Sequence, residues 1–301
     1  MRLSAIVLST EDDYTPSGVS AMAKGVLGII ICPMNDDYLI HSICTDKEVG
    51  RIVLLANQYS DRIKTKLEAK GAKFDVFPEY YFDMGNVKFD RDILNVVIKA
   101  NDLALHAEPK DLKEHVEKQI TAIQPLVDAV GLYYGLCGNF GWDITEWCKE
   151  KGFKNTAVFR ALDGRVCDDC VAIAIGGTEK YKKLEREYMG MFYVTPAISD
   201  NWEVFVGAGD LGKQLKSISK ETLEGLGIHS EQDYMRWLFE LGHYENILMI
   251  DSGLGNKEVF ENQVAEMGKT LNLKPIRCAE GWATLECAES LYNECKGYLS
   301  S

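Results

Sequence analysis

Short apolar runs recur along the chain and alternate with longer segments in which apolar residues recur at helical spacing. Apolar runs bounded by glycine, proline or charged residues are typical of buried β-strands. On this basis we expect strands at 28–31, 51–56, 73–77, 131–135, 156–160, 191–194, 247–250 and 275–277. The helical spacing predicts helices at 58–70, 90–105, 111–130 and 143–151.

The alternation of strands with helices predicts the fold class. Strands joined through helices pair in parallel by right-handed crossovers. We therefore expect an α/β protein with mostly parallel sheets and flanking helices, built from two or three similar α/β units. The chain divides into an N-terminal extension at 1–24, an α/β unit at 25–150 and one or more units at 151–301. Because ligands of such sheets bind beyond the carboxyl ends of the strands, the residues that follow each strand are the candidate site residues.

Cys137 lies in a glycine-rich turn directly after the strand at 131–135, between Gly135 and Gly138. A helix is expected from residue 143, and the positive end of a helix lowers the pKa of a nearby thiol. This position would favour the thiolate, which is the form that binds metal ions. The alternative is a tight turn that contains a buried thiol with a packing role only.

Cys167 and Cys170 form a C-x-x-C pair in front of an apolar helical segment. Such a pair suits one metal ion or a dithiol, but a structural zinc site usually needs a second pair nearby, which the sequence lacks. Asp168 and Asp169 lie between the two cysteines and oppose thiolate formation, which argues against thioredoxin-like chemistry.

Cys32 follows the strand at 28–31 and is the third candidate ligand. Thiolates from separate strand ends can share one iron–sulfur cluster or metal ion and leave a position open for substrate. We predict that Cys32, Cys137 and Cys170 converge as metal ligands; the alternative is three independent structural thiols. Four further residues are expected to contact the cofactor: Gly138, Asn139, Asp169 and Asp251.

Two other segments near strand ends are weaker candidates. Arg236, His243 and Tyr244 precede the strand at 247–250 and are candidates to face the crevice, whereas Asp251 follows that strand. An acid at this position can hold a ligand or a cation, but a capping turn explains Asp251 equally well.

The segment 207–212 matches the G-x-G-x-x-G fingerprint of dinucleotide-binding folds and follows a possible strand at 202–206. A true site needs a second strand with an acid at its end. The downstream segment 213–227 is instead polar and helical in pattern, so we interpret the match as a loop.

The charge of the chain narrows the classes of partner. With 33 basic and 46 acidic residues, the net charge is −13. A surface with this much negative charge repels phosphate backbones and anionic lipid. We therefore do not expect nucleic acid or membranes as partners. Acidic residues follow the first apolar residues directly, which does not fit a signal peptide, and we expect a cytoplasmic protein. In that reducing compartment the nine cysteines are expected to be thiols.

Several short motifs together resemble the family catalogued as domain of unknown function 1638. They are YYGLCGN at 133–139, DDCVA at 168–172, YVTP at 193–196 and IDSG at 250–253. The resemblance implies a protein of methanogens and other strict anaerobes, encoded near corrinoid methyl-transfer systems, and no established reaction. Cys167 stands where the family usually has another residue, which makes Cys170 the preferred ligand, and residues 1–24 resemble an addition to the family pattern.

The cysteines at the strand ends predict a metal- or iron–sulfur-binding protein, and the resemblance implies that it belongs to anaerobic one-carbon metabolism. The expected cofactor is an iron–sulfur cluster or a single metal ion, with zinc among the candidates, and a corrinoid would be brought by a partner. A corrinoid protein or a methyltransferase is the expected partner, and a homo-oligomer is an open alternative. As an enzyme, the protein would transfer a methyl group to a bound acceptor thiol or assist metallocofactor maturation.

Two other functions remain open at this point. One is a non-catalytic binding module or accessory subunit for a small anionic ligand or for a corrinoid or methyltransferase partner. The other is a purely structural subunit in which the cysteines have packing roles.

Overall fold

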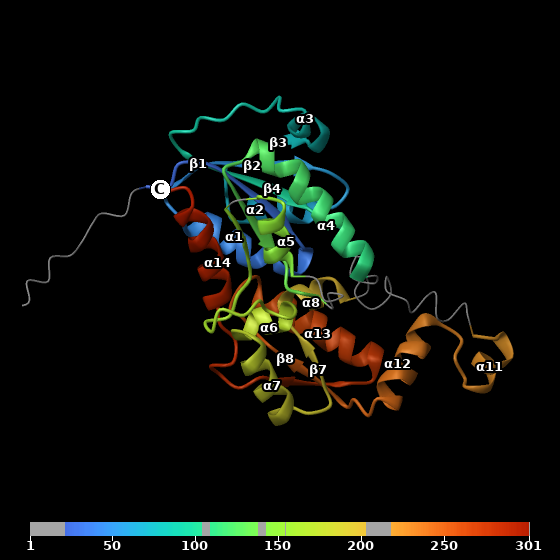
Figure 1. Ribbon diagram of the computed structural model, residues 1–301. Coiled ribbons are helices and arrows are strands. Elements are labelled where there is room, and N and C mark those ends of the chain that lie inside the picture. The colour runs from blue at the N-terminus through green and yellow to red at the C-terminus, as the bar shows by residue number, and fades with distance from the viewer. Residues whose placement is uncertain (1–21, 104–108, 138–142, 154, 203–217, 301) are drawn as a thin grey trace, which may run out of the picture.

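The structure is a computed structural model that describes residues 22–103, 109–137, 143–153, 155–202 and 218–300. It contains a six-stranded and a three-stranded sheet, and every strand pairing in both is parallel (Figure 1). The first sheet has the order β3 (Asp75–Pro78), β2 (Val49–Ala56), β4 (Leu94–Ala100), β1 (Gly25–Ile31), β5 (Ala129–Tyr133) and β6 (Thr156–Val158). The second has the order β7 (Met191–Val194), β8 (Asn246–Met249) and β9 (Lys274–Arg277). The predicted α/β class with parallel sheets is confirmed.

Helices connect and cover the strands. Around the first sheet lie η1 (Pro33–Asn35), α1 (Asp36–Thr45), α2 (Asp61–Ala69), α3 (Glu79–Asp83), α4 (Pro109–Ile123), η3 (Gln124–Leu126) and α5 (Ile144–Glu150). The rest of the chain forms α6 (Cys170–Ile175), α7 (Thr178–Glu187), α8 (Pro196–Asp200), α11 (Lys220–Gly225), α12 (Glu231–Leu241), α13 (Lys257–Leu271) and α14 (Glu286–Gly297). In the described part of the chain, none of these helices is both long and apolar enough to cross a bilayer.

Two of the predicted helices were wrong in whole or in part. The segment 90–105 contains β4, a central strand in which all seven residues are buried. Its two polar residues, Asn95 and Lys99, are buried and lie four residues apart, a spacing that also fits one face of a helix. The β-branched Val96, Val97 and Ile98 were the better signal. The helix predicted at 111–130 ends at Ile123, because Pro125 cannot continue it.

The position of Cys32 follows from the central strand of the first sheet. All seven residues of β1 are buried, and the strand lies between β4 and β5. Ile31 is paired with Ala100 on one side and with Tyr133 on the other. The residue that follows, Cys32, therefore lies in the middle of the carboxyl edge of this sheet.

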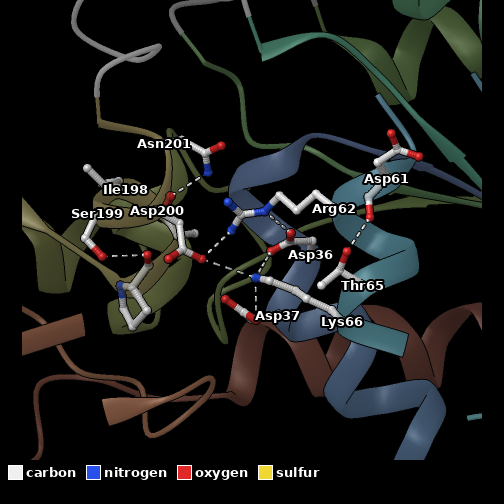
Figure 2. A network of polar contacts seen from close by, with 12 residues as sticks. Asp36, Asp37, Asp61, Arg62, Thr65, Lys66, Ile198, Ser199, Asp200 and Asn201 are labelled. Atoms are coloured by element: carbon white, nitrogen blue, oxygen red, sulfur yellow. Dashed lines mark hydrogen bonds and ion pairs between the residues drawn. The ribbon is translucent and has the colours of Figure 1, made fainter. Parts of the chain in front are cut away.

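The two sheets meet at this edge. Helix η1 follows β1 and contacts α8, which follows β7. A charged network joins the same regions: Asp36 at the start of α1 pairs with Arg62 and Lys66 of α2, and Arg62 also reaches Asp200 of α8 at 2.8 Å (Figure 2). At the end of the chain, α14 returns from the second sheet to pack against α1, β5 and β6 (Figure 1).

Candidate functional site

A cavity of about 500 Å³ lies where the carboxyl edge of the first sheet faces the second sheet. Cys32, Cys137 and Cys170 all line it, and so does Asp169. The structure thus brings together the three cysteines singled out from the sequence, which come from three separate elements.

The other three predicted cofactor contacts are not among the described residues of the cavity wall. Gly138 and Asn139 are outside the described residues. Asp251 is not among the described residues that line the cavity, and its carboxylate accepts the backbone N–H of Gly253 at 2.9 Å. The bond closes a short turn after β8, but Asp251 caps no described helix, because the N-cap of α13 is Asn256. The G-x-G-x-x-G match at 207–212 also lies outside the described residues.

Backbone hydrogen bonds hold Cys137 next to the start of α6. The N–H of Leu136 donates to the carbonyl oxygen of Cys167 at 2.9 Å, and the N–H of Cys137 donates to that of Asp168 at 2.6 Å. Gly135 makes this approach possible, because a Cβ there would lie 3.0 Å from the Cys167 carbonyl oxygen. Cys137 itself has a φ of 51°, a conformation rare for residues other than glycine and often found at functional sites.

The thiols that face the cavity are held in their protonated form. Burial raises the pKa of Cys137 to about 12. Burial also raises the pKa of Cys32 and of Cys170 well above the usual value, with further contributions from Cys137 near Cys32 and from Asp169 near Cys170.

The expectation that a helix lowers the pKa of Cys137 is therefore wrong. The following helix, α5, begins only at Ile144, and its first backbone N–H groups are already bonded by the side chain of Asp143. Desolvation of the buried thiol is the largest influence on its pKa, and it raises that pKa.

The three thiols share a cavity without forming a finished metal cage. Among the residues that the structure describes, no group of three or more His, Cys, Asp or Glu side chains is placed to hold a metal ion. The three cysteines have the type of donor atom, soft sulfur, that a thiophilic metal prefers. To hold one centre together, the three side chains would have to move towards one another and lose their protons.

Cys167 faces away from this cavity, although it belongs to the same C-x-x-C motif as Cys170. Its Sγ lies 3.7 Å from the Sγ of Cys287 in α14, and both residues are buried. The two cysteines of the motif therefore point to different places. Cys167 thus packs against α14 and is not among the described residues that line the cavity.

Much of the remaining cavity wall is aromatic, and the sequence did not point to most of it. Tyr181 and Glu185 from α7 line the cavity together with Phe192 and Tyr193 from β7. Tyr244, which was a candidate from the sequence, also lines it. The available signal was the spacing of Tyr181 and Glu185, because residues four apart share one face of a helix.

Of the other two residues in that candidate segment, Arg236 is engaged away from the cavity. Its Nε donates to the carbonyl oxygen of Thr270 at 2.5 Å. His243 adopts a positive φ of 57° just before Tyr244 and is not among the described residues that line the cavity.

Comparison with known proteins places the chain in a family. The model of the family described as protein of unknown function (DUF1638) matches residues 101–288. The match includes Cys137, Cys170 and the aromatic wall, whereas Cys32 lies before it. No curated protein matches the chain, and no solved structure does. Since the family model covers well over half of the 301 residues, the chain belongs to the DUF1638 family.

Proposed function

We propose that the protein binds a thiophilic metal centre, either an iron–sulfur cluster or a single ion such as zinc, through Cys32, Cys137 and Cys170. The observation that best supports this proposal is the presence of all three thiols in the wall of one cavity. They come from separate segments of the chain, and both sheets contribute to the cavity around them. The space beside the thiols would admit a substrate or a partner's cofactor.

The family resemblance supplies the metabolic setting of this proposal. In anaerobic one-carbon metabolism, a thiolate-bound metal can activate an acceptor thiol towards a methyl group. The protein would then act as a methyltransferase or as an accessory or maturation factor beside a corrinoid partner. A non-catalytic binding module is the second candidate, favoured by the volume of about 500 Å³ and the partly apolar wall of the cavity.

The proposal predicts that the protein contains bound metal and that its metal content depends on each of the three cysteines. Protein purified without oxygen, or reconstituted with iron and sulfide or with zinc, should contain stoichiometric metal by elemental analysis and absorption spectra. The single variants Cys32→Ser, Cys137→Ser and Cys170→Ser should each fall to background, because a hydroxyl is a poor ligand for soft metals.

Cys167→Ser is the matched control for these variants. Its thiol contacts Cys287 and not the cavity, so this variant should retain the metal content of the wild type. A wild-type protein that stays metal-free after reconstitution would refute the proposal, and so would full metal content in all three cavity variants.

The proposal also predicts that metal binding strengthens as the pH rises. Burial raises the pKa of all three thiols, so each is protonated at neutral pH and must release its proton when a metal binds. Below the thiol pKa, each released proton changes the apparent affinity by about tenfold per pH unit. Competition with a chromophoric zinc chelator at several pH values measures this slope. A slope near zero would show that no thiol releases a proton when the metal binds.

A further inference from the structure

Besides the three thiols, the wall of the cavity combines aromatic rings with carboxylates. Tyr181, Tyr193 and Tyr244 contribute the rings, and Asp169 and Glu185 contribute the acids. Among the described residues that line the cavity there is no Lys, Arg or His. The negative charge of the two acids is therefore not balanced by a cation in the described wall, which disfavours an anionic ligand.

The aromatic rings are held at angles that form two sides of a cage. The rings of Tyr181 and Tyr193 have their centroids 5.9 Å apart and their planes at 73°. The Tyr193 hydroxyl donates to the carbonyl oxygen of Tyr188 at 3.0 Å, which fixes its ring. Phe239 packs edge-on against Tyr244, with ring centroids 5.5 Å apart. Electron-rich ring faces attract cations, and the attraction grows as the site excludes water.

A buried polar atom in the same wall lacks a partner. Asn35 lines the cavity and is only 2% exposed. Its Nδ2 donates to the carbonyl oxygen of Tyr133 at 2.9 Å, but its Oδ1 is buried and has no hydrogen-bond partner among the described residues. A buried acceptor without a donor is unfavourable, so a ligand that carries an O–H or N–H group would stabilise the site.

From these observations we infer that the cavity binds a small organic cation of the alkylammonium class that carries a hydrogen-bond donor. The rings and the acids attract the charge, and Asn35 accepts the donor. A volume of about 500 Å³ lies within the range of small-molecule sites and accommodates such an ion. This inference goes beyond the proposed metal centre, because it uses rings, carboxylates and an amide of the same cavity and does not require a metal.

Choline and its uncharged isostere 3,3-dimethylbutan-1-ol test the charge, since the two have the same shape and the same hydroxyl. Isothermal titration calorimetry on the full-length protein should show that choline binds and that the isostere binds about tenfold or more weakly. Tetramethylammonium, which cannot donate to Asn35, should bind about threefold or more weakly than choline. Equal binding of choline and the isostere, or no binding of choline at millimolar concentration, would overturn the inference. Equal binding of tetramethylammonium and choline would overturn the assignment of the donor to Asn35.

Three variants locate the site. Tyr181→Leu keeps an apolar side chain but removes the ring, so it should weaken choline binding about tenfold, whereas Tyr181→Phe should bind as the wild type does. Tyr80→Leu replaces a tyrosine that is 67% exposed on α3, away from the cavity, and should have no effect. Equal affinity of the Leu and Phe variants at position 181 would contradict the aromatic cage. If Tyr181→Leu fails to fold, the comparison of choline with its uncharged isostere on the wild-type protein still tests whether the cavity binds a cation.

Metal content and choline binding are measured on the same preparations, so that the two proposals can fail separately. Choline binding without metal in the reconstituted protein would refute the proposed function and leave this inference standing. Stoichiometric metal without choline binding would overturn this inference alone.

Discussion

Replacing Asp36 with asparagine is expected to lower the free energy of unfolding by about 2–3 kcal/mol. The side chain of Asp36 is 0% exposed, and its two oxygens pair with Arg62 and with Lys66, the latter at 2.8 Å (Figure 2). Asparagine keeps the size of the side chain and removes its charge. The variant therefore leaves two cations facing a neutral amide at the point where the sheets meet.

The expected loss is smaller than for a fully buried pair for two reasons. Breaking a buried ion pair typically costs about 3–5 kcal/mol. Here the side chains of Arg62 and Lys66 remain 24% and 20% exposed, so water still solvates part of their charge. Asp37 lies 2.6 Å from Lys66, and Asp200 lies 2.8 Å from Arg62 and 3.7 Å from Lys66, so each cation keeps at least one carboxylate.

Asp61→Asn is the matched control, because Asp61 is the first residue of α2 just as Asp36 is the first residue of α1. Both substitutions remove a carboxylate from a helix N-terminus, an effect of about 0.3–1 kcal/mol. Asp61 is exposed, so the difference between the two variants isolates the network. Equilibrium unfolding in urea measures both. Equal losses would show that the network contributes nothing to stability.

The convergence of the cysteines was predictable from the sequence to the extent that it depends on parallel strands. Cys32 follows β1, and Cys137 lies beyond the end of β5, which pairs with β1. Once both runs are recognised as strands of one parallel sheet, their ends must share an edge. Cys170 is different, because it begins a helix. It reaches the cavity through the hydrogen bonds between residues 136–137 and 167–168, which no local pattern encodes.

The aromatic side chains of the cavity wall and the direction of the thiol pKa shifts could not be predicted without the tertiary structure. Tyr181 and Tyr193 belong to the part of the chain that forms the second sheet and its helices. Whether they face Cys32 depends on how that sheet docks on the first, through η1, α8 and the charged network. The pKa of Cys137 likewise depends on burial by distant segments, and this outweighs the helix that the local sequence predicts.

Replacing Gly177 with alanine is expected to lower the free energy of unfolding by about 3 kcal/mol, from backbone strain and overpacking together. Gly177 precedes α7 with φ 116° and ψ 170°, a combination that is essentially restricted to glycine. A Cβ at this position would lie 2.3 Å from the Cβ of Ala161. Ala161 cannot easily retreat, because its N–H donates to the carbonyl oxygen of Arg165 and its own carbonyl oxygen accepts the N–H of Gly164.

Gly71→Ala separates the two contributions to this loss. Gly71 also has a positive φ, of 68°, but a Cβ there would meet no atom within 4 Å, so this variant should lose only about 1–2 kcal/mol.

Gly177 also affects the site, because its carbonyl oxygen accepts the N–H of Tyr181 at 3.0 Å and its N–H donates to the carbonyl oxygen of Ala172 of α6 at 2.7 Å. Moving Gly177 away from Ala161 shifts the helix that carries Tyr181 relative to the helix that carries Cys170. Gly177→Ala should therefore weaken choline binding, whereas Gly71→Ala leaves it unchanged. Equal losses of stability in the two variants, with choline binding intact in both, would show that the close contact with Ala161 does not set the position of α7.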